Sequence, residues 1–305
     1  MTNYQLEYKP LVSVIVITYN SAKYVFETLE SIQQQTYSNI ELIVCDDGSK
    51  DNTVDLCQKW MDKKKDRFVR TQLIASDINK GIPANCNRGL KAARGNWVKF
   101  IAGDDALKEN CIKSNVSYVG ANPCVNIIKS NMEFYRSCFN PSSLTEVSDL
   151  KNKPFFKPAI SSKEQYKMIL KNRGIIMTPT LFFKKSCLLK VDGFDERLRL
   201  FEDLPMLIKL TQKGYRIDFL NEVTVKYRIS NYSVQKGQNP YKSIDFAQEL
   251  LLFNKLYVKN QISSLRYHIR NLGIRLIIVL NMLGLNRQCK ISHLLFRVAN
   301  IIRKI

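Results

Sequence analysis

Two adjacent carboxylates follow a strongly apolar stretch, "NWVKFIAGDDAL", at residues 96–107. The apolar part is typical of a buried strand, and Asp104 and Asp105 stand where that strand ends. Two negative charges this close repel each other and resist the loss of water. A divalent cation would relieve both effects, and hard cations prefer oxygen ligands. The pair is therefore a candidate metal site, with a solvated surface as the alternative.

A second acid pair, Asp46 and Asp47, ends another apolar run, "IELIVCDDGS", at residues 40–49. Acids before Gly and Ser also suit a turn that caps the following helix, so the pair alone is weak evidence. The carboxyl ends of parallel strands meet at one edge of a sheet, and ligands of such sheets bind there. We therefore expect both acid pairs to face one crevice.

The elements that must position these acids alternate along the first hundred residues. Apolar, β-branched runs predict strands at 11–19, 40–46, 71–76 and 96–103. Helical patterns lie between them, at 25–32, 54–61 and 84–94. This alternation predicts an α/β fold with a mostly parallel sheet flanked by helices. Residues 120–180 are less regular and include a loop-like stretch at 140–158. Order returns over 181–228, where "YRIDFL" and "VTVKYRI" predict two strands.

The charge balance narrows the class of partner. The chain of 305 residues has 47 basic and 27 acidic residues, a net charge of +20, which implies an anionic partner such as nucleic acid, anionic lipid or a phosphorylated substrate. Eight cysteines without CxxC spacing and only two histidines argue against zinc, and predict reduced, mostly buried thiols. Neither a signal peptide nor a spanning segment is expected, which predicts a cytoplasmic protein.

The segment after Glu249 contains ten basic residues and no acidic one. In "ISHLLFRVANIIRKI" the apolar side chains share one helical face: Ile291, Leu294, Leu295, Val298, Ile302 and Ile305. Arg297, Arg303 and Lys304 lie elsewhere. This pattern is typical of a helix on an anionic membrane surface, and a helix packed on the rest of the protein is the alternative. We expect a catalytic domain over 1–249 and a basic, helical, membrane-associating tail over 250–305.

Three blocks of the sequence resemble the family 2 glycosyltransferases, which have the Rossmann-like GT-A fold. They are "VSVIVITYNSAKYVFETLESIQQQTYSNIELIVCDDGSKDNT", "NKGIPANCNRGLKAARGNWVKFIAGDDAL" and "VDGFDERLRLFEDLPMLIKLTQKGYRI". Together they cover about residues 11–235 in the family's order and spacing. The resemblance implies a nucleotide-sugar half at about 10–120 and an acceptor half at about 121–249.

The resemblance also implies roles for individual residues in the first half. Asp105 would hold a divalent metal, Mn²⁺ or Mg²⁺, and Asp104 would hold hydroxyls of the ribose or the sugar. Asp47 matches the acid that hydrogen-bonds the nucleotide base. Tyr19 matches an aromatic residue beside that base, and a core residue at the end of a strand is its alternative. The remaining expected nucleotide-sugar contacts are Thr18, Asn20, Asn79, Gly81 and Asn87.

Asp203, in the dipeptide Glu202-Asp203, matches the family's catalytic base. An attacking hydroxyl must lose its proton, and a carboxylate within hydrogen-bond reach can accept it. Without the neighbouring "GFDE", the dipeptide would be interpreted as an acid pair favoured by a helix dipole. The family resemblance implies inversion at the anomeric carbon. Glu202 and Thr178 are assigned to the acceptor side.

Three positions depart from the family's pattern. Ala102 stands where many members have a further acid. The absence of that acid should leave metal binding intact. Cys86 lies where an Arg is frequent, so Arg88 or Lys80 is expected to contact the diphosphate. Ser230 replaces a His that can assist the metal, which predicts weak, exchangeable metal binding.

The expected function is transfer of one sugar from a nucleotide-diphosphate sugar, UDP by default, to a lipid-linked glycan in bacterial surface-polysaccharide synthesis such as capsule or O-antigen. The enzyme would lie peripherally on the inner face of the cytoplasmic membrane, with no nucleic-acid partner. A basic nucleic-acid-binding protein is one alternative, although no helix-turn-helix, zinc finger or RNA-recognition signature is present. A catalytically inactive sugar-nucleotide-binding relative is the other, and the presence of Asp105 and Asp203 disfavours it.

Overall fold

The computed structural model describes residues 8–171, 177–229, 243–285 and 290–304 of the chain. One nine-stranded mixed sheet runs through it in the order β3-β2-β1-β4-β8-β6-β9-β5, with β7 paired to β6. The strands are β1 (Val12–Thr18), β2 (Ile40–Asp46), β3 (Arg70–Ala75), β4 (Trp97–Ala102), β5 (Ala106–Leu107), β6 (Ile127–Arg136), β7 (Leu144–Val147), β8 (Leu181–Lys184) and β9 (Ile217–Ile229).

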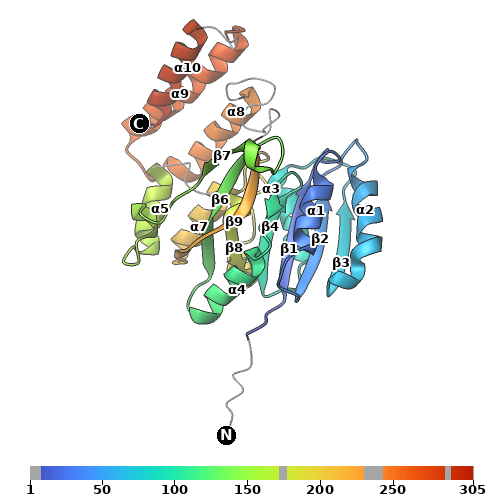
Figure 1. Ribbon diagram of the computed structural model, residues 1–305. Coiled ribbons are helices and arrows are strands. Elements are labelled where there is room, and N and C mark those ends of the chain that lie inside the picture. The colour runs from blue at the N-terminus through green and yellow to red at the C-terminus, as the bar shows by residue number, and fades with distance from the viewer. Residues whose placement is uncertain (1–7, 172–176, 230–242, 286–289, 305) are drawn as a thin grey trace.

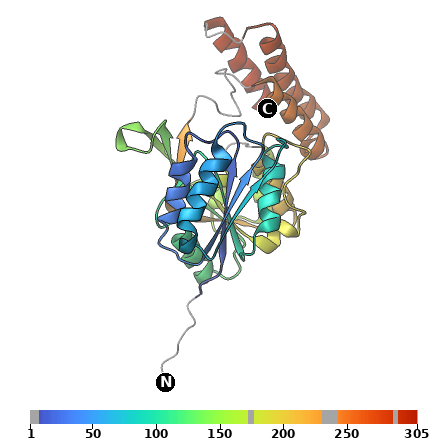
Figure 2. The ribbon, with the colours of Figure 1, turned by 90° about the vertical axis from the view of Figure 1, so that its right-hand side faces the viewer.

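The first half of the sheet is parallel, as the apolar runs predict. Strands β1, β2, β3 and β4 pair in parallel register, and β1 and β2 are buried almost throughout. Helices α1 (Val25–Gln33) and α2 (Thr53–Lys64) cover one face of these strands, and α3 (Ile82–Ala92) covers the other (Figure 2). Because both faces are covered, the strands read as continuous apolar runs rather than as alternating ones.

The second half of the sheet is mixed. Strand β8 is antiparallel to both β4 and β6, whereas β6 and β9 are parallel. Helix α4 (Cys111–Ala121) packs on the same face as α1, and α5 (Ser162–Lys171) and α7 (Asp203–Gln212) pack on the opposite face. Shorter helical elements are α6 (Lys185–Leu189) and the 3₁₀ turns Lys65–Arg67, Pro141–Ser143, Pro154–Phe156 and Thr178–Thr180.

Two elements differ from the sequence-based expectation. The stretch expected to be a loop at 140–158 contains β7, whose four residues are all exposed. An exposed strand buries no apolar face, so it leaves no periodic signal in the sequence. Strand β9 is one strand of 13 residues where two separate strands were expected, and its pairing with β6 shifts register around Asn131.

The C-terminal helices form a separate layer beyond the edge at which β1 and β4 end (Figure 1). They are α8 (Ile244–Phe253), a π-helical turn (Asn254–Val258), α9 (Ser264–Met282) and α10 (Lys290–Lys304). Phe253, Val258 and Ile277 belong to the same buried cluster as Phe201, which lies just before α7. The boundary expected at residue 249 therefore falls inside α8, and α8 and α9 share the core of the domain that they follow.

Helix α10 packs beside α9 at the outer end of this layer. Its Phe296 and Ala299 are buried, whereas Leu294, Leu295 and Val298 of the expected face are 62%, 37% and 44% exposed. The apolar face expected for this helix is thus largely turned away from the protein where its side chains are described. Within the described ranges, we find no helix with the length and apolarity needed to cross a membrane.

The described cysteines agree with the expectation of reduced thiols. Seven are unpaired, and five of these are buried: Cys45, Cys57, Cys86, Cys111 and Cys187.

Candidate active site

The acid pair Asp104-Asp105 occupies the short connection between β4 and β5. Strand β4 pairs with β1, and β5 pairs with β9 at Val225 and Lys226. Asp104 and Asp105 therefore connect the two halves of the sheet. Asp105 is buried, and its Oδ1 accepts a hydrogen bond from the main-chain N–H of Arg228 at 2.9 Å. The Arg228 Nε donates to the Asp104 carbonyl at 2.8 Å. The connection is therefore held rigidly from both sides.

Burial and mutual repulsion make this pair reluctant to ionise. Burial raises the pKa of Asp104, and burial together with the Asp104 charge raises the pKa of Asp105 well above its usual range. A divalent cation would oppose both effects, so these two carboxylates fit a metal. The described residues contain no group of three or more His, Cys, Asp or Glu side chains able to hold a metal. The remaining ligands would then come from outside this group, and Ser230 lies outside the described residues.

The acid pair that contains the candidate base, Glu202-Asp203, lies at the start of α7. Asp203 is the first residue of that helix and Glu202 precedes it. Burial, and then the Glu202 charge, raise the pKa of Asp203 to about 7, although its carboxylate accepts from the Leu204 N–H at 2.7 Å. Burial also raises the pKa of Glu202, while the adjacent Thr178 acts in the opposite direction. A carboxylate with a pKa near neutrality is suited to accept a proton at physiological pH.

Tyr227 on β9 connects the two acid pairs. Burial raises the pKa of its hydroxyl, and the charges of four nearby carboxylates raise it further: Asp105, Asp104, Glu202 and Asp203. The two pairs are about a hundred residues apart in sequence, yet both lie near enough to this phenol for their charges to act on it. Asp105 and Asp203, which the family resemblance assigns to the metal and to the base, therefore lie in the same part of the fold.

Asp47 lies at the end of β2 and binds the N-terminal end of α3. Its carboxylate accepts from the main-chain N–H groups of Lys80 at 3.1 Å and Gly81 at 2.7 Å, and it forms an ion pair with Arg88 at 2.6 Å. Gly81 has a φ of 97° and precedes the first residue of the helix. An added Cβ there would lie 2.5 Å from the Arg199 carbonyl, so both space and backbone conformation require glycine.

Asp46 has a structural environment instead. Its carboxylate accepts from Ser49 N at 2.8 Å and from the Thr18 hydroxyl at 2.8 Å, and it also bonds the Ser49 hydroxyl. Asn20, with a φ of 49°, donates its N–H to Ser49 and accepts from Lys50 N. The turn interpretation therefore holds for Asp46, and it also ties the loop after β1 to the loop after β2.

The other expected nucleotide-sugar residues divide into two groups. Tyr19 is 49% exposed at the end of β1, so the core interpretation of this residue is wrong and its ring is free to meet a ligand. The amide of Asn87 instead bonds both main-chain groups of Phe194 and the Glu196 carboxylate. Asn79 accepts from the Arg199 guanidinium. These two asparagines fasten the loop before α7 to the α3 region.

Arg228 is the residue that sequence reasoning missed. It is 2% exposed, and its guanidinium lies 4.2 Å from the ring centre of Tyr24 and 4.0 Å from that of Phe139. It also faces Glu27 at 3.1 Å and bonds the Ser137 carbonyl. This buried cation tethers α1, the β6–β7 turn and the acid connection to one another. Arg228 lies two residues before Ser230, and the sequence prediction assigned it no role.

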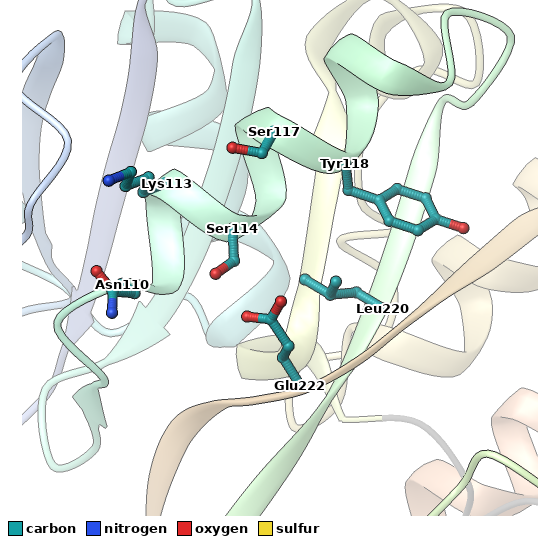
Figure 3. A pocket seen from close by; sticks show the side chains of 7 residues that line it. All are labelled: Asn110, Lys113, Ser114, Ser117, Tyr118, Leu220 and Glu222. Carbon is teal, nitrogen blue, oxygen red and sulfur yellow. The ribbon is translucent and has the colours of Figure 1, made fainter.

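A shallow groove of about 480 Å³ lies elsewhere, between α4 and β9 (Figure 3). Seven residues line it: Asn110, Lys113, Ser114, Ser117, Tyr118, Leu220 and Glu222. None of the residues expected in the nucleotide-sugar or catalytic site is among them. The groove is therefore distinct from the carboxylate cluster around Tyr227.

With this geometry in place, the comparisons with known proteins identify the family. Residues 13–190 match the profile of glycosyl transferase family 2, more than half of the chain. The chain belongs to this family, and its sheet and flanking helices are the GT-A fold expected from the sequence.

Relatives among curated proteins agree with this assignment. The chain is 41% identical over 105 residues to the glycosyltransferase GlyG of Streptococcus pneumoniae, covering 34% of this chain and 33% of GlyG. It is 27% identical over 242 residues to the uncharacterized glycosyltransferase EpsJ of Bacillus subtilis, covering 76% of this chain and 64% of EpsJ. The putative teichuronic acid biosynthesis glycosyltransferase TuaG of B. subtilis is 26% identical, covering 78% and 85%. The chain thus spans about a third of GlyG and just under two thirds of EpsJ.

Solved structures share the fold at low sequence identity. The S. aureus TarS 1-349 complex with UDP-GlcNAc has a TM-score of 0.63 at 20% identity, covering 95% of this chain and 79% of TarS 1-349. The mannosyltransferase PcManGT of Pyrobaculum calidifontis, in complex with GDP-Man and Mn²⁺, has a TM-score of 0.59 at 18% identity, covering 97% and 81%. At these identities the likeness establishes the architecture alone.

Proposed function

We propose that the protein is a metal-dependent, inverting glycosyltransferase that moves one sugar from a nucleotide-diphosphate sugar to a hydroxyl of a glycan acceptor. The observation that carries this proposal is the placement of two buried acid pairs within range of the same phenol, Tyr227, one pair after β4 and one at the start of α7. Membership of family 2 supports glycosyl transfer as the reaction. UDP is the proposed nucleotide, supported by the fold shared with the TarS complex with UDP-GlcNAc.

Each acid pair has a separate task in this proposal. Asp105, with Asp104 beside it, would hold Mn²⁺ or Mg²⁺, which would stabilise the negative charge that develops on the diphosphate leaving group. Asp203 accepts the proton of the attacking hydroxyl, because its pKa of about 7 leaves it a base of useful strength near neutral pH. Glu202, which precedes Asp203, and Thr178, which lies beside Glu202, would lie on the acceptor side. Tyr19 and Asp47 would contact the nucleotide.

The proposed acceptor is a lipid-linked glycan at an anionic membrane surface, in surface-polysaccharide synthesis. The tail supports this location, because α10 exposes Leu294, Val298 and Ile301 on a segment without acidic residues. Apolar side chains of such a helix can enter the interfacial region while basic side chains remain at the head groups. The relationship to TuaG, a putative teichuronic acid biosynthesis enzyme, supports a polymer acceptor.

A screen of nucleotide sugars by melting temperature, with and without Mn²⁺, tests the donor assignment. We expect one UDP-sugar to raise the melting temperature only when metal is present, and slow release of UDP from that sugar into water. An Asp203→Asn variant should still bind donor and metal, yet transfer sugar at least about 100-fold more slowly. The proposal fails if no nucleotide sugar binds, or if Asp203→Asn transfers sugar at the normal rate.

A further inference from the structure

The loop that precedes the proposed base, residues 194–202 and here called the base loop, is held by the C-terminal helices. Glu249 on α8 accepts from two consecutive main-chain N–H groups of this loop, from Arg199 at 2.7 Å and from Leu200 at 2.9 Å. One carboxylate thus binds both amides at once. Hydrogen bonds to an ionised acceptor are shorter and stronger than neutral ones, so this contact restricts the loop more than a typical turn does.

Packing and a second polar contact reinforce the same attachment. The ring of Phe201 lies 5.6 Å from the ring of Phe246 and 5.5 Å from that of Phe253, both on α8. The Tyr257 hydroxyl, in the π-helical turn after α8, donates to Asp195 in the base loop. The base loop is therefore bound by α8 and the turn after it near the loop's beginning, middle and end.

On its other side, the base loop touches the segment that binds Asp47. The Arg199 carbonyl accepts from Ile82 N at 2.8 Å, and the Arg199 guanidinium donates to the Asn79 carbonyl at 2.9 Å. Gly81, whose N–H binds Asp47, has no room for a Cβ because Arg199 lies against it. Arg199 thus contacts residues 79–82, the segment that binds Asp47, through its side chain and carbonyl, while its N–H is bound by Glu249.

We propose that Glu249 is a positioning residue for sugar transfer: α8 clamps the base loop and so sets where Asp203 lies relative to the donor. Asp203 stands four residues after Arg199, at the end of the clamped loop. A displacement of about 1 Å in a catalytic group can reduce a rate by on the order of 100-fold. The C-terminal helices therefore serve the chemistry as well as any surface on which they lie. This inference rests on the proposed role of Asp203.

The test compares Glu249→Ala, Glu249→Gln and a matched control, Asp245→Asn, in the 305-residue chain. Asp245 is an exposed acid on the same helix, so its replacement changes the charge of α8 by the same amount without touching the base loop. Amide hydrogen exchange is measured at Arg199 and Leu200 without any ligand. Donor KM, kcat for transfer and melting temperature are measured with the UDP-sugar found by the screen.

We expect Glu249→Ala to accelerate exchange at both amides and to lower kcat by about 10- to 100-fold with Asp245→Asn unchanged. Glu249→Gln keeps one acceptor oxygen and should fall between the two, which also serves if the alanine variant does not fold. Unchanged exchange, or faster exchange with normal kcat, overturns the inference. A loss of melting temperature that matches the loss of activity in every variant also overturns it, because the role would then be merely structural. If the unmodified protein transfers no sugar, or if no nucleotide sugar binds in the donor screen, the proposed function is refuted instead. The exchange result would still decide whether Glu249 holds the loop.

Discussion

The raised pKa of Asp203 predicts how the rate of transfer depends on pH. With a pKa of about 7, the ionised fraction of this carboxylate rises from roughly 9% at pH 6 to roughly 91% at pH 8. Since only the ionised form accepts a proton, kcat/KM should increase about tenfold over this interval and then level off. A carboxylate with its ordinary pKa of 3.8 would give a flat profile over the same range.

Replacing Glu202 by glutamine tests the cause of the shift. The Glu202 charge raises the pKa of Asp203, so its removal should move the ascending limb to lower pH and make the variant relatively more active at pH 6. Burial is the larger cause and remains, so the limb should not move all the way to the ordinary value. Because the two acids titrate together, the limb reports the pair rather than one residue.

The assay is single-turnover transfer at saturating metal between pH 5.5 and 8.5, which separates chemistry from product release. Asp203→Asn is the control, and it should remove the limb along with about 99% of the rate. A pH-independent rate in the unmodified protein between pH 6 and 8 would refute the proposed base. An identical limb in the Glu202→Gln variant would refute the electrostatic explanation while leaving Asp203 as the base.

Three further predictions concern the metal, the tail and the core. Asp105→Asn should remove the metal-dependent stabilisation by the UDP-sugar while the free protein stays folded, and full activity with normal metal dependence would contradict the assignment. Deletion of everything after residue 285 removes α10 but spares the buried part of α9, so it should weaken flotation with anionic liposomes at low salt and preserve donor hydrolysis; equal flotation of both proteins would contradict a membrane role. Burial and nearby Lys99 lower the pKa of Lys129 from 10.5 to about 7, so the folded state disfavours its charge and stability should rise with pH from about 7 to 10.5. Lys129→Met should therefore stabilise the protein at pH 7 by roughly 2–3 kcal/mol in chemical denaturation, after allowing for the lost hydrogen bonds to the Ser130 carbonyl and the Thr180 hydroxyl, and this gain should shrink toward pH 10.

Local sequence predicted the first half of the fold because its strands are buried on both faces. Continuous apolar runs gave β1, β2, β3 and β4, and the acids at their ends lie at the expected edge of the sheet. Strand β7 was missed because all of its residues are exposed. The mixed pairing of β8 with β4 and β6 has no local signature, since the direction of a short strand depends on segments far away in the chain.

Site residues that would use their side chains on a ligand could be predicted from the sequence. Residues whose contacts go to main-chain groups were harder to predict. Asp105, Asp203 and Asp47 are acids in recognisable blocks. The contacts of Glu249 go to main-chain N–H groups, which have no residue code, so its role could not be read from sequence. Asn87 looked like a donor contact because its block does, yet its amide bonds Phe194. Residue type and spacing do not distinguish binding a ligand from fastening a loop.

The position of Asp104 and Asp105 between β4 and β5 determines when the acid pair can assemble during synthesis of the chain. Strand β5 pairs with β9 at Val225 and Lys226, roughly 120 residues further along the chain. At about 5–20 residues per second, a ribosome needs on the order of ten seconds to add that length. During this interval β1 to β4 can already pair, but one flank of the acid connection and the Arg228 that buries it have not been synthesised. A nascent chain stalled before residue 225 should therefore have a folded parallel sheet and no assembled acid pair, so premature termination gives a fragment that cannot consume donor.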